Sequence, residues 1–306
     1  MTPRQPTGAE DRPQEAGHVE RASAPPSLSP RDIKFHVNRF ISRHRERFAE
    51  RDVVDAPAGT GIASAALAAA GARVTPLDLF PEFFRAPGLT CHKADLAGRL
   101  PLDDGAADVV LCQEGLEHLA DQLHALREFN RVLRPGGVLL LTTPNASNLK
   151  SRLSHLLFES EYSGKLMPPN EVDSIWVARE EARPELYLGH LFLIGVMRLR
   201  ALARIAGFRL EALHPVRVNR TSALLWPLLY PLLAASARLT RRQACRRHPH
   251  PDRARLREVY AELVRLNLHP RVLLGTHLFV ELRKERAADE AARRLTGKYA
   301  DFDVVT

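Results

Sequence analysis

Short apolar runs alternate along the chain with longer segments in which apolar residues recur every three or four positions. The short runs predict seven strands, at 53–54, 73–79, up to 94–95, 107–112, 138–143, 208–218 and 275–283. The longer segments predict helices at 62–71, 116–133 and 198–206. Strands that alternate with crossover helices are typical of a parallel sheet covered on both faces. We therefore predict an α/β fold with a doubly wound, mostly parallel sheet of seven strands.

Several segments lie outside this alternation. Residues 1–32 are poor in large apolar side chains and rich in Pro, Glu, Gly and Ser, so we expect a disordered leader there. The main domain is predicted at 33–285, and 286–306 are expected to form a charged C-terminal helix and tail. Two stretches, at about 146–188 and 219–273, interrupt the strand and helix pattern. We expect helical insertions at both places, where they would shape a substrate site.

The positive net charge of the chain reflects a coding bias in part. The chain holds 44 Lys and Arg against 36 Asp and Glu, a formal charge of +8. Only six of the basic residues are Lys, and this preference for Arg, together with abundant Ala, is typical of a GC-rich coding bias. Part of the positive net charge therefore does not indicate binding to nucleic acid or anionic lipid.

The cysteines and the N-terminus bear on the compartment. Cys91, Cys112 and Cys245 are too few and too scattered for a disulfide scaffold or a thiolate metal cluster. Cys112 stands within an apolar run, so we expect it in the core. The first 32 residues contain no apolar run of the length that an export signal needs. We therefore expect a cytoplasmic protein.

A glycine-containing loop follows the first predicted strand. Asp55-Ala-Pro-Ala-Gly-Thr-Gly61 joins that strand to a helix, a position where backbone N–H groups can approach a ligand closely. The dinucleotide pattern G-x-G-x-x-G would need a glycine where Ser64 stands, whereas Asp78 could serve as its usual acidic partner. A nicotinamide-dependent oxidoreductase is therefore one alternative.

Further segments follow in a definite order along the chain. They are Asp78 after the second strand, Asp95-Leu96 after the third, a Gln-Glu-Gly-Leu-Glu-His-Leu segment at 113–119, and Leu-Arg-Pro-Gly-Gly at 133–137. Together with the first loop they resemble the motifs of class I S-adenosylmethionine-dependent methyltransferases over roughly 50–145, 186–214 and 275–283. The 113–119 segment resembles the E-x-x-E-H segment of the branch that includes ubiquinone-biosynthesis O-methyltransferases. The resemblance implies a Rossmann-like methyltransferase domain at 33–285 and S-adenosylmethionine as the cofactor.

The resemblance also assigns residues to the cofactor. It implies that Gly59 and Gly61 pack under the amino acid end of the cofactor and that Asp55 helps to hold its ammonium group. Asp78 would accept hydrogen bonds from both ribose hydroxyls, Asp95 one from the adenine amino group, and Gln113 would line the methionine side. One departure is that Pro57 and Ala58 stand where most members have glycine and many have cysteine. The complete predicted set is Asp55, Pro57, Ala58, Gly59, Gly61, Asp78, Leu79, Asp95, Leu96 and Gln113.

Methyl transfer to a hydroxyl also needs a group that removes the proton. His118 and His190 are our candidates, because a histidine titrates near neutral pH and related sequences carry histidines at both places. His190 could instead be a structural residue at a helix start. A further alternative is a divalent cation held by Glu114, Glu117 and His118, which would gather a catechol-like acceptor. The pair His248-Pro-His250 lies in a polar, Arg-rich stretch and is expected in a surface loop.

The second insertion combines leucines with arginines. Residues 223–234 hold Trp226 and Tyr230 among leucines, and they are followed by Arg238, Arg241, Arg242, Arg246 and Arg247. Such a segment, at 221–247, suits a bilayer interface with anionic head groups. The alternatives are a lid over the active site or a dimer contact. The uncharged part, 221–237, is short for a bilayer and contains two prolines, so we predict no spanning helix.

These observations predict an enzyme that methylates oxygen in an amphipathic or lipid-linked small molecule or saccharide. We expect it in the cytoplasm, with peripheral attachment to the inner face of the membrane as one possibility. Besides the oxidoreductase, two alternatives remain. One is a catalytically silent methyltransferase-like adaptor for a membrane or partner, and the other is an RNA-directed methyltransferase. The basic cluster is short and lacks interleaved aromatic residues, so nucleic acid is not our prediction.

Overall fold

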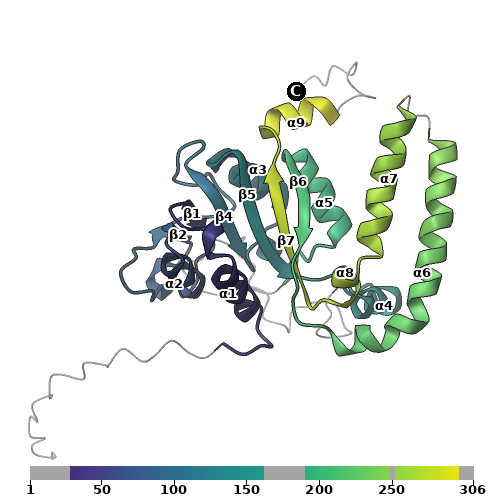
Figure 1. Cartoon of the computed structure of the whole chain (residues 1–306), viewed down its shortest axis with the longest axis horizontal. Coiled ribbons are helices and arrows are strands. Elements are labelled where there is room, and N and C mark those ends of the chain that lie inside the picture. Colours follow the sequence, from purple (N-terminus) through teal and green to yellow (C-terminus); the bar gives the residue numbers. More distant parts are fainter. Residues whose placement is uncertain (1–27, 162–189, 249–251, 296–306) are drawn as a thin grey trace, which may run out of the picture.

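The computed structural model describes residues 28–161, 190–248 and 252–295. Within these ranges the strands form one seven-stranded sheet with the order β3-β2-β1-β4-β5-β7-β6 (Figure 1). The strands are β1 (Asp52–Asp55), β2 (Arg73–Asp78), β3 (His92–Lys93), β4 (Ala107–Gln113), β5 (Leu133–Pro144), β6 (Phe208–Leu213) and β7 (His277–Lys284). Strands β1 to β5 pair in parallel, and β7 runs antiparallel to both of its neighbours. The predicted doubly wound, Rossmann-like, mostly parallel fold is confirmed.

Helices cover both faces of this sheet. On one face lie α1 (Ile33–Arg43) and α2 (Ile62–Ala69), which share an apolar cluster with Val138 and Leu140 of β5. On the other face α3 (Gln122–Val132) and α5 (Val196–Ile205) pack against Leu139 and Leu141 of the same strand. Successive side chains of a strand point to opposite faces, so one apolar strand supplies both cores. Cys112 is fully buried in the second cluster, as expected.

The boundaries of several elements differ from the prediction. The helix expected at 116–133 is divided into a 3-10 turn, η3 (Leu116–His118), and α3, because Asp121 caps the N-terminus of α3. Strand β5 already begins at Leu133, and β6 ends at Leu213. The remaining short elements are η1 (Arg45–Arg47), η2 (Pro81–Phe83) and α9 (Ala288–Leu295).

In the described parts of the two insertions there are four helices. They are α4 (Leu149–Phe158) in the first, and α6 (Arg220–Arg247), α7 (Arg253–Asn267) and α8 (Pro270–Leu274) in the second. The long helices α6 and α7 lie side by side at one edge of the molecule (Figure 1). Most of the first insertion and residues 1–27 of the predicted leader lie outside the described residues, as does the end of the tail.

Helix α6 is longer than the sequence pattern indicated. It continues for 28 residues through Pro227 and Pro231, both of which face solvent. There water can satisfy the carbonyl groups that the missing proline N–H groups leave free. Among the described residues α6 alone has the length and composition to cross a membrane, and only 11% of its most apolar window is buried. The two prolines therefore do not end the helix, and the absence of a membrane-spanning helix stays a prediction.

Candidate active site

A groove runs along the carboxyl ends of β1, β2 and β4. It consists of two adjoining cavities of about 280 and 140 Å³ that share Pro57, Asp78 and Glu114. Nine of the ten residues predicted for the cofactor line the groove; the exception is Gly61. The larger cavity is lined by Asp55 and Gln113, which are predicted to contact the amino acid end of the cofactor. The smaller cavity is lined by Asp95 and Leu96, which are predicted to lie on the adenine side. Cofactor binding by these residues stays a prediction. Because they lie along one groove, substitutions can test it.

The two glycines of the first loop have different local roles. Gly59 has a φ of +53°, and a side chain there would point into open space. Its N–H donates to Asp78 Oδ2 over 2.7 Å, so the carboxylate at the end of β2 fixes the loop. Gly61 has a φ of +84° at the start of α2, and a Cβ would lie 2.7 Å from both Phe84 and Ala86. Gly61 therefore serves the turn and its packing rather than the surface of the groove.

Pro57 is accommodated by a glycine from another strand end. A Cβ at Gly115 would lie 2.6 Å from Pro57 Cδ and 3.3 Å from Leu96 Cδ1. Only a glycine leaves the proline ring this space. Pro57 consequently lines both cavities without closing either, which explains how the loop tolerates a proline in place of the usual glycine.

Asp55 is a buried carboxylate with an unused acceptor. It is 1% exposed, and Ser64 Oγ donates to its Oδ2 over 2.5 Å. Among the described residues Oδ1 has no hydrogen-bond partner. Burial and the nearby charge of Asp78 raise the pKa of Asp55 to about 7. A ligand ammonium group would satisfy the open oxygen and favour the ionised carboxylate. The Ser64 side chain, where a dinucleotide site needs glycine, is committed to this carboxylate.

Lys34 also lines the larger cavity, and sequence reasoning missed it. It stands in the first turn of α1, whose N-terminus is capped by the Asp32 side chain. An ammonium group at this place is suited to the carboxylate of an amino acid ligand. One signal was available, because Lys34 is one of only six lysines in an arginine-rich chain. The packing of α1 over the loop is a tertiary feature that the local pattern does not contain.

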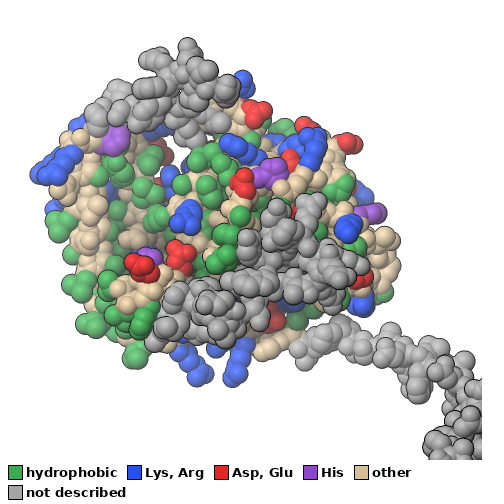
Figure 2. Space-filling model, turned by 180° about the vertical axis from the view of Figure 1, so that it is seen from behind, with side chains coloured by type: hydrophobic (Ala, Val, Ile, Leu, Met, Phe, Trp, Pro, Cys, Tyr) green, Lys and Arg blue, Asp and Glu red, His purple; other side chains and the backbone are tan. Residues whose placement is uncertain are grey.

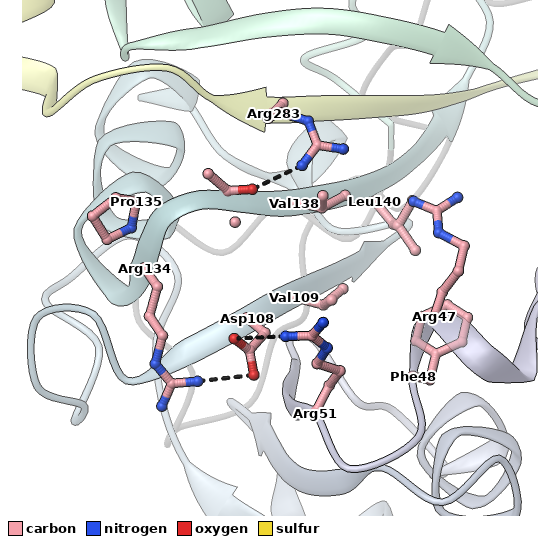
Figure 3. Close-up of a pocket in the computed structure, with 12 residues that line it drawn as sticks. Arg47, Phe48, Arg51, Asp108, Val109, Arg134, Pro135, Val138, Leu140 and Arg283 are labelled. Carbon is pink, nitrogen blue, oxygen red and sulfur yellow. Dashed lines mark hydrogen bonds and ion pairs between the residues drawn. The ribbon is translucent and has the colours of Figure 1, made fainter.

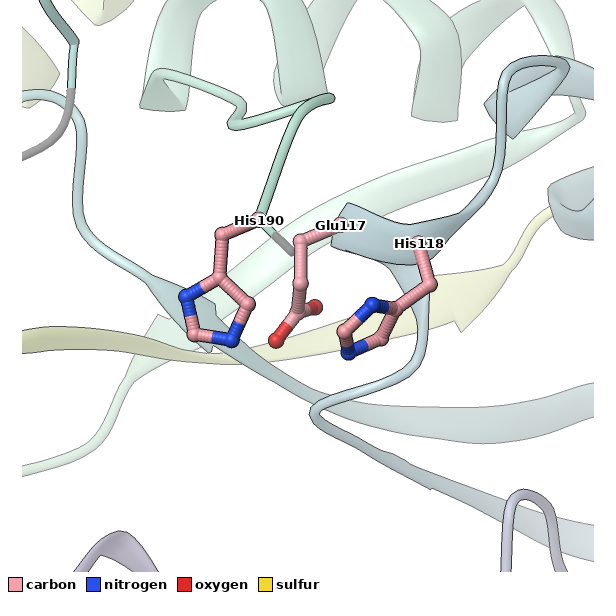
Figure 4. A group of neighbouring side chains, drawn as sticks. All are labelled: Glu117, His118 and His190. Atoms are coloured by element: carbon pink, nitrogen blue, oxygen red, sulfur yellow. The ribbon is translucent and has the colours of Figure 1, made fainter. Parts of the chain in front are cut away.

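Glu117, His118 and His190 meet beside the groove (Figure 4). Each offers one ligating atom, and these atoms all lie within 4.8 Å of one another. The two imidazole rings are 5.4 Å apart and roughly edge to face. The segment after His190 is tied to η3, because Phe192 N donates to Glu117 O over 3.2 Å. The two histidines predicted from the sequence are thus brought together.

The electrostatics of this cluster are set by burial. Glu117 is fully buried, and it accepts one hydrogen bond from Thr143 Oγ1 at 3.1 Å. Its other oxygen has no hydrogen-bond partner within the described ranges. Burial and the charge of Glu114 raise the pKa of Glu117 to about 8. Burial and the neighbouring His118 lower the pKa of His190. Perturbed titratable groups beside a groove are typical of functional sites.

Glu114 does not join this group, so the predicted cation set of Glu114, Glu117 and His118 needs correction. A φ of +52° turns the Glu114 backbone away from the regular strand path. Its carboxylate accepts from Thr142 Oγ1 at 3.1 Å and lies 3.3 Å from His277 Nε2. The group that could hold an ion in the described part of the chain contains His190 in place of Glu114. His277, at the start of β7, was not among our candidates.

Exposed leucines gather on the insertion helices. Leu224, Leu228 and Leu232 recur every four residues along α6 and are 64 to 79% exposed. Helix α4 packs against α6 and ends in a further exposed apolar group. Hydrophobic side chains follow the left edge of Figure 2, where α6 lies when the molecule is seen from behind. We call this surface the α4–α6 face; it consists of Leu156, Leu157, Phe158, Leu224, Leu228, Leu232 and Leu239.

Two remaining predictions concern residues away from the groove. Burial raises the pKa of the Cys112 thiol well above its usual range, so this cysteine is an inert core residue. His248 is exposed directly after α6, whereas His250 lies outside the described residues.

Comparisons with known proteins concern the part of the chain that carries most of the groove. Residues 54–141 match a family described as a methyltransferase domain. Over 128 residues the chain is 34% identical to a ubiquinone biosynthesis O-methyltransferase of Xanthomonas campestris pv. campestris, covering 38% of this chain and 52% of that protein. Over 126 residues it is 36% identical to a protein of Mycolicibacterium smegmatis described as a probable S-adenosylmethionine-dependent methyltransferase, covering 39% of this chain and 49% of that protein.

The extent of these similarities is limited. The match spans about half the length of the curated relatives. Among solved structures, the YcgJ protein of Bacillus subtilis has a TM-score of 0.47 and 14% identity, with 82% of this chain and 99% of that chain covered. The similar regions contain the first loop, the acids after β2 and β3, and the E-x-x-E-H segment. Over residues 54–141 the chain is thus similar to a methyltransferase domain.

Proposed function

We propose that this protein transfers a methyl group from S-adenosylmethionine to a hydroxyl oxygen of an amphipathic or lipid-linked small molecule or saccharide. The observation that carries the proposal is that His118 lines the same cavity as Asp78 and Asp95. When bound, the cofactor supplies a sulfonium methyl group for in-line displacement. A base beside the groove is what a hydroxyl acceptor requires, because its proton leaves as the oxygen attacks.

The two histidines are suited to take that proton. The lowered pKa of His190 keeps its ring neutral near pH 7, so one ring nitrogen can accept a proton. Glu117 lies within reach of both rings. Once an imidazolium forms, its charge favours ionisation of the Glu117 carboxyl, which then orients and stabilises the protonated ring.

A divalent cation is a second way to activate the acceptor. It is favoured by the three ligating atoms of Glu117, His118 and His190 within 4.8 Å of one another. An ion there would gather two neighbouring acceptor oxygens and lower the pKa of a bound hydroxyl. A chelator distinguishes the two mechanisms. Turnover by the histidines alone survives EDTA, whereas turnover through an ion is lost and returns with added Mg²⁺ or another divalent cation.

The proposed acceptor class rests on the α4–α6 face. Contiguous exposed apolar surfaces usually mark a membrane or a partner. The sequence of α6 contains no acidic residue, and five of its arginines follow the leucine stripe. Apolar side chains beside clustered Arg fit the boundary between acyl chains and anionic head groups. We therefore place the protein on the cytoplasmic face of a membrane, where lipid-linked acceptors would reach the groove.

The activity is tested with two catechols that differ only in alkyl length, 4-methylcatechol and 4-octylcatechol. We expect formation of S-adenosylhomocysteine with both, and a lower KM for the octyl compound. His118→Ala should lower turnover by about 10²- to 10⁴-fold and leave S-adenosylhomocysteine affinity within about twofold. The control is His44→Ala, a histidine before η1 that does not line the groove. Normal turnover in His118→Ala would remove this residue both as a base and as a ligand.

Membrane attachment is tested by sedimentation with phosphatidylcholine vesicles that contain or lack phosphatidylglycerol. The triple variant Leu224→Ser, Leu228→Ser, Leu232→Ser should lose binding to both kinds of vesicle. Arg241→Gln with Arg242→Gln should lose only the preference for the anionic lipid. The matched control is Arg253→Gln with Arg257→Gln on α7, which changes charge equally outside this surface. Unchanged sedimentation of the serine variant would refute the proposal, and loss of a dimer on gel filtration instead would identify a contact between copies.

A further inference from the structure

A second hollow lies at the amino ends of β4 and β5, on the opposite edge of the sheet from the groove. It has a volume of about 320 Å³, and its charged lining consists of Arg47, Arg51, Arg134, Arg283 and Asp108 (Figure 3). Asp108 and Gln113 are five residues apart on β4, so the charged lining of the hollow lies about 16 Å from the groove at roughly 3.3 Å per residue. The two sites are therefore distinct.

Two of the arginines are held from outside the hollow. Arg47 Nη2 lies 2.6 Å from Glu281, and Arg283 Nε lies 2.7 Å from Glu211. Neither glutamate lines the hollow. Arg283 also donates to Gly136 O over 2.9 Å. These pairs fix the positions of the guanidinium groups but use only part of their five donors.

The other two arginines share Asp108. Arg134 lies 2.8 Å from Asp108 Oδ2, and its second partner is Asp52 at 2.8 Å. Arg51 is 58% exposed and lies 3.7 Å from Asp108 Oδ1, beyond hydrogen-bond distance. Figure 3 shows both guanidinium groups beside this one carboxylate. The lining holds four arginines and one aspartate, so its N–H donors outnumber its carboxylate acceptors, while Glu281, Glu211 and Asp52 balance charge from outside.

We propose that this hollow binds a small soluble phosphoanion with two phosphate groups. Guanidinium groups match phosphate oxygens in pairs, and fixed guanidinium groups lose little entropy when they bind. The four guanidinium groups keep N–H donors beyond those that pair with Asp108 and with the carboxylates outside the hollow, which favours a ligand with many acceptor oxygens. Val109, Val138 and Leu140 supply an apolar wall that strengthens these interactions. The arginines converge on a concavity instead of forming a stripe, which favours a compact anion over a polymer backbone.

The probe for this site is inorganic diphosphate, titrated calorimetrically into the full chain in a buffer free of phosphate and divalent cations. We expect saturable one-to-one binding that weakens at least about tenfold in Arg51→Gln, because this guanidinium has the fewest partners of the four. Arg257→Gln, an equal loss of charge on the exposed surface of α7, should bind as the unmodified chain does. Melting temperature and S-adenosylhomocysteine affinity of each variant establish that it is folded.

Two results would overturn the proposal. If inorganic diphosphate gives no binding heat and no shift in melting temperature, the arginines form only a structural ion-pair network. If Arg257→Gln weakens binding as much as Arg51→Gln, diphosphate binding depends on the net charge of the protein, and the hollow is not a specific binding site. Tighter binding of uridine diphosphate than of inorganic diphosphate would support the proposal and assign the apolar wall to a nucleoside.

Discussion

The carboxylates at the two edges of the sheet differ in how their oxygens are satisfied. At the carboxyl edge, Asp55 and Glu117 each keep one oxygen without a hydrogen-bond partner in the described part of the chain. Their pKa values are raised by burial, to about 7 and about 8. At the amino edge, hydrogen bonds from Arg73 and Arg134 lower the pKa of Asp52 to about 2.

This difference separates scaffold from site. An unpartnered buried acceptor costs free energy, so it is retained where a ligand or a reaction uses it. At the amino edge the carboxylates are paired with arginines of the same chain. The groups that remain without a full set of partners there are arginine N–H donors and not carboxylate oxygens. Cations and hydroxyl groups are therefore expected at the carboxyl edge, and anions at the amino edge.

The largest effect on this comparison is expected from Asp78→Ala. Asp78 accepts from Gly59 N and Phe80 N, and it is the carboxylate assigned to the ribose hydroxyls. Loss of these charge-assisted bonds should weaken S-adenosylhomocysteine binding about 100-fold, measured by calorimetry. Asp103→Ala removes an exposed carboxylate elsewhere and serves as the control. Unchanged affinity in Asp78→Ala would contradict the assignment to the ribose.

Gly115→Ala tests whether the proline in the first loop depends on this glycine. A Cβ would lie 2.6 Å from Pro57 Cδ, so the variant should lose about 1 to 3 kcal/mol of stability. Chemical denaturation measures the change. Pro57→Gly in the same chain should restore most of it by removing the ring. If the double variant is as unstable as Gly115→Ala alone, the two residues do not share this space.

Lys34→Ala tests the residue that the sequence pattern missed. Removing its ammonium group should weaken S-adenosylhomocysteine binding about tenfold, the effect of one charged hydrogen bond at an open site. Lys34→Arg should retain most of the affinity. Adenosine lacks the amino acid end and should bind all three proteins equally, which calorimetry can measure. An equal loss for adenosine would mean that Lys34 supports the fold of the groove instead.

The last prediction concerns the dependence of stability on pH. The pKa of Glu117 is about 8 in the folded chain against an ordinary value of 4.5, so the folded state keeps a proton that the unfolded chain releases. The stability contributed by this group falls as the pH rises from about 5 to 8. The Glu117→Gln variant has no titratable group at this position. Its melting temperature, relative to that of the unmodified chain, should therefore rise as the pH increases across this range. A difference that stays constant with pH would contradict the raised pKa.

Much of the fold could be predicted because its signals are local. Most strands of the sheet contain apolar runs, with β3 (His92–Lys93) as an exception, and the order of loop motifs is readable along the chain. The boundary of β5 at Leu133 was missed because the Arg-Pro-Gly-Gly segment looks like a turn. Leu133 nevertheless pairs with Ala107, and the register shifts before pairing resumes at Val138. The length of α6 was missed because its prolines face solvent, which their positions in the sequence do not reveal.

The candidate site was less predictable, because tertiary packing assembles it. The loop motif located Asp55 and Gly59, but the room for Pro57 comes from Gly115 after another strand. His118 and His190 were recognised separately, and only the fold shows that they share Glu117. His277 reaches Glu114 because β7 runs antiparallel and brings its first residue to the carboxyl edge.

Calorimetric titration of the full chain with S-adenosylhomocysteine, alongside NADH, tests the central claim most directly. It needs no knowledge of the acceptor. We predict one-to-one binding of S-adenosylhomocysteine in the micromolar range and no binding of NADH. Binding of NADH alone would identify a nicotinamide site, and binding of neither would contradict the assignment of the groove to this cofactor.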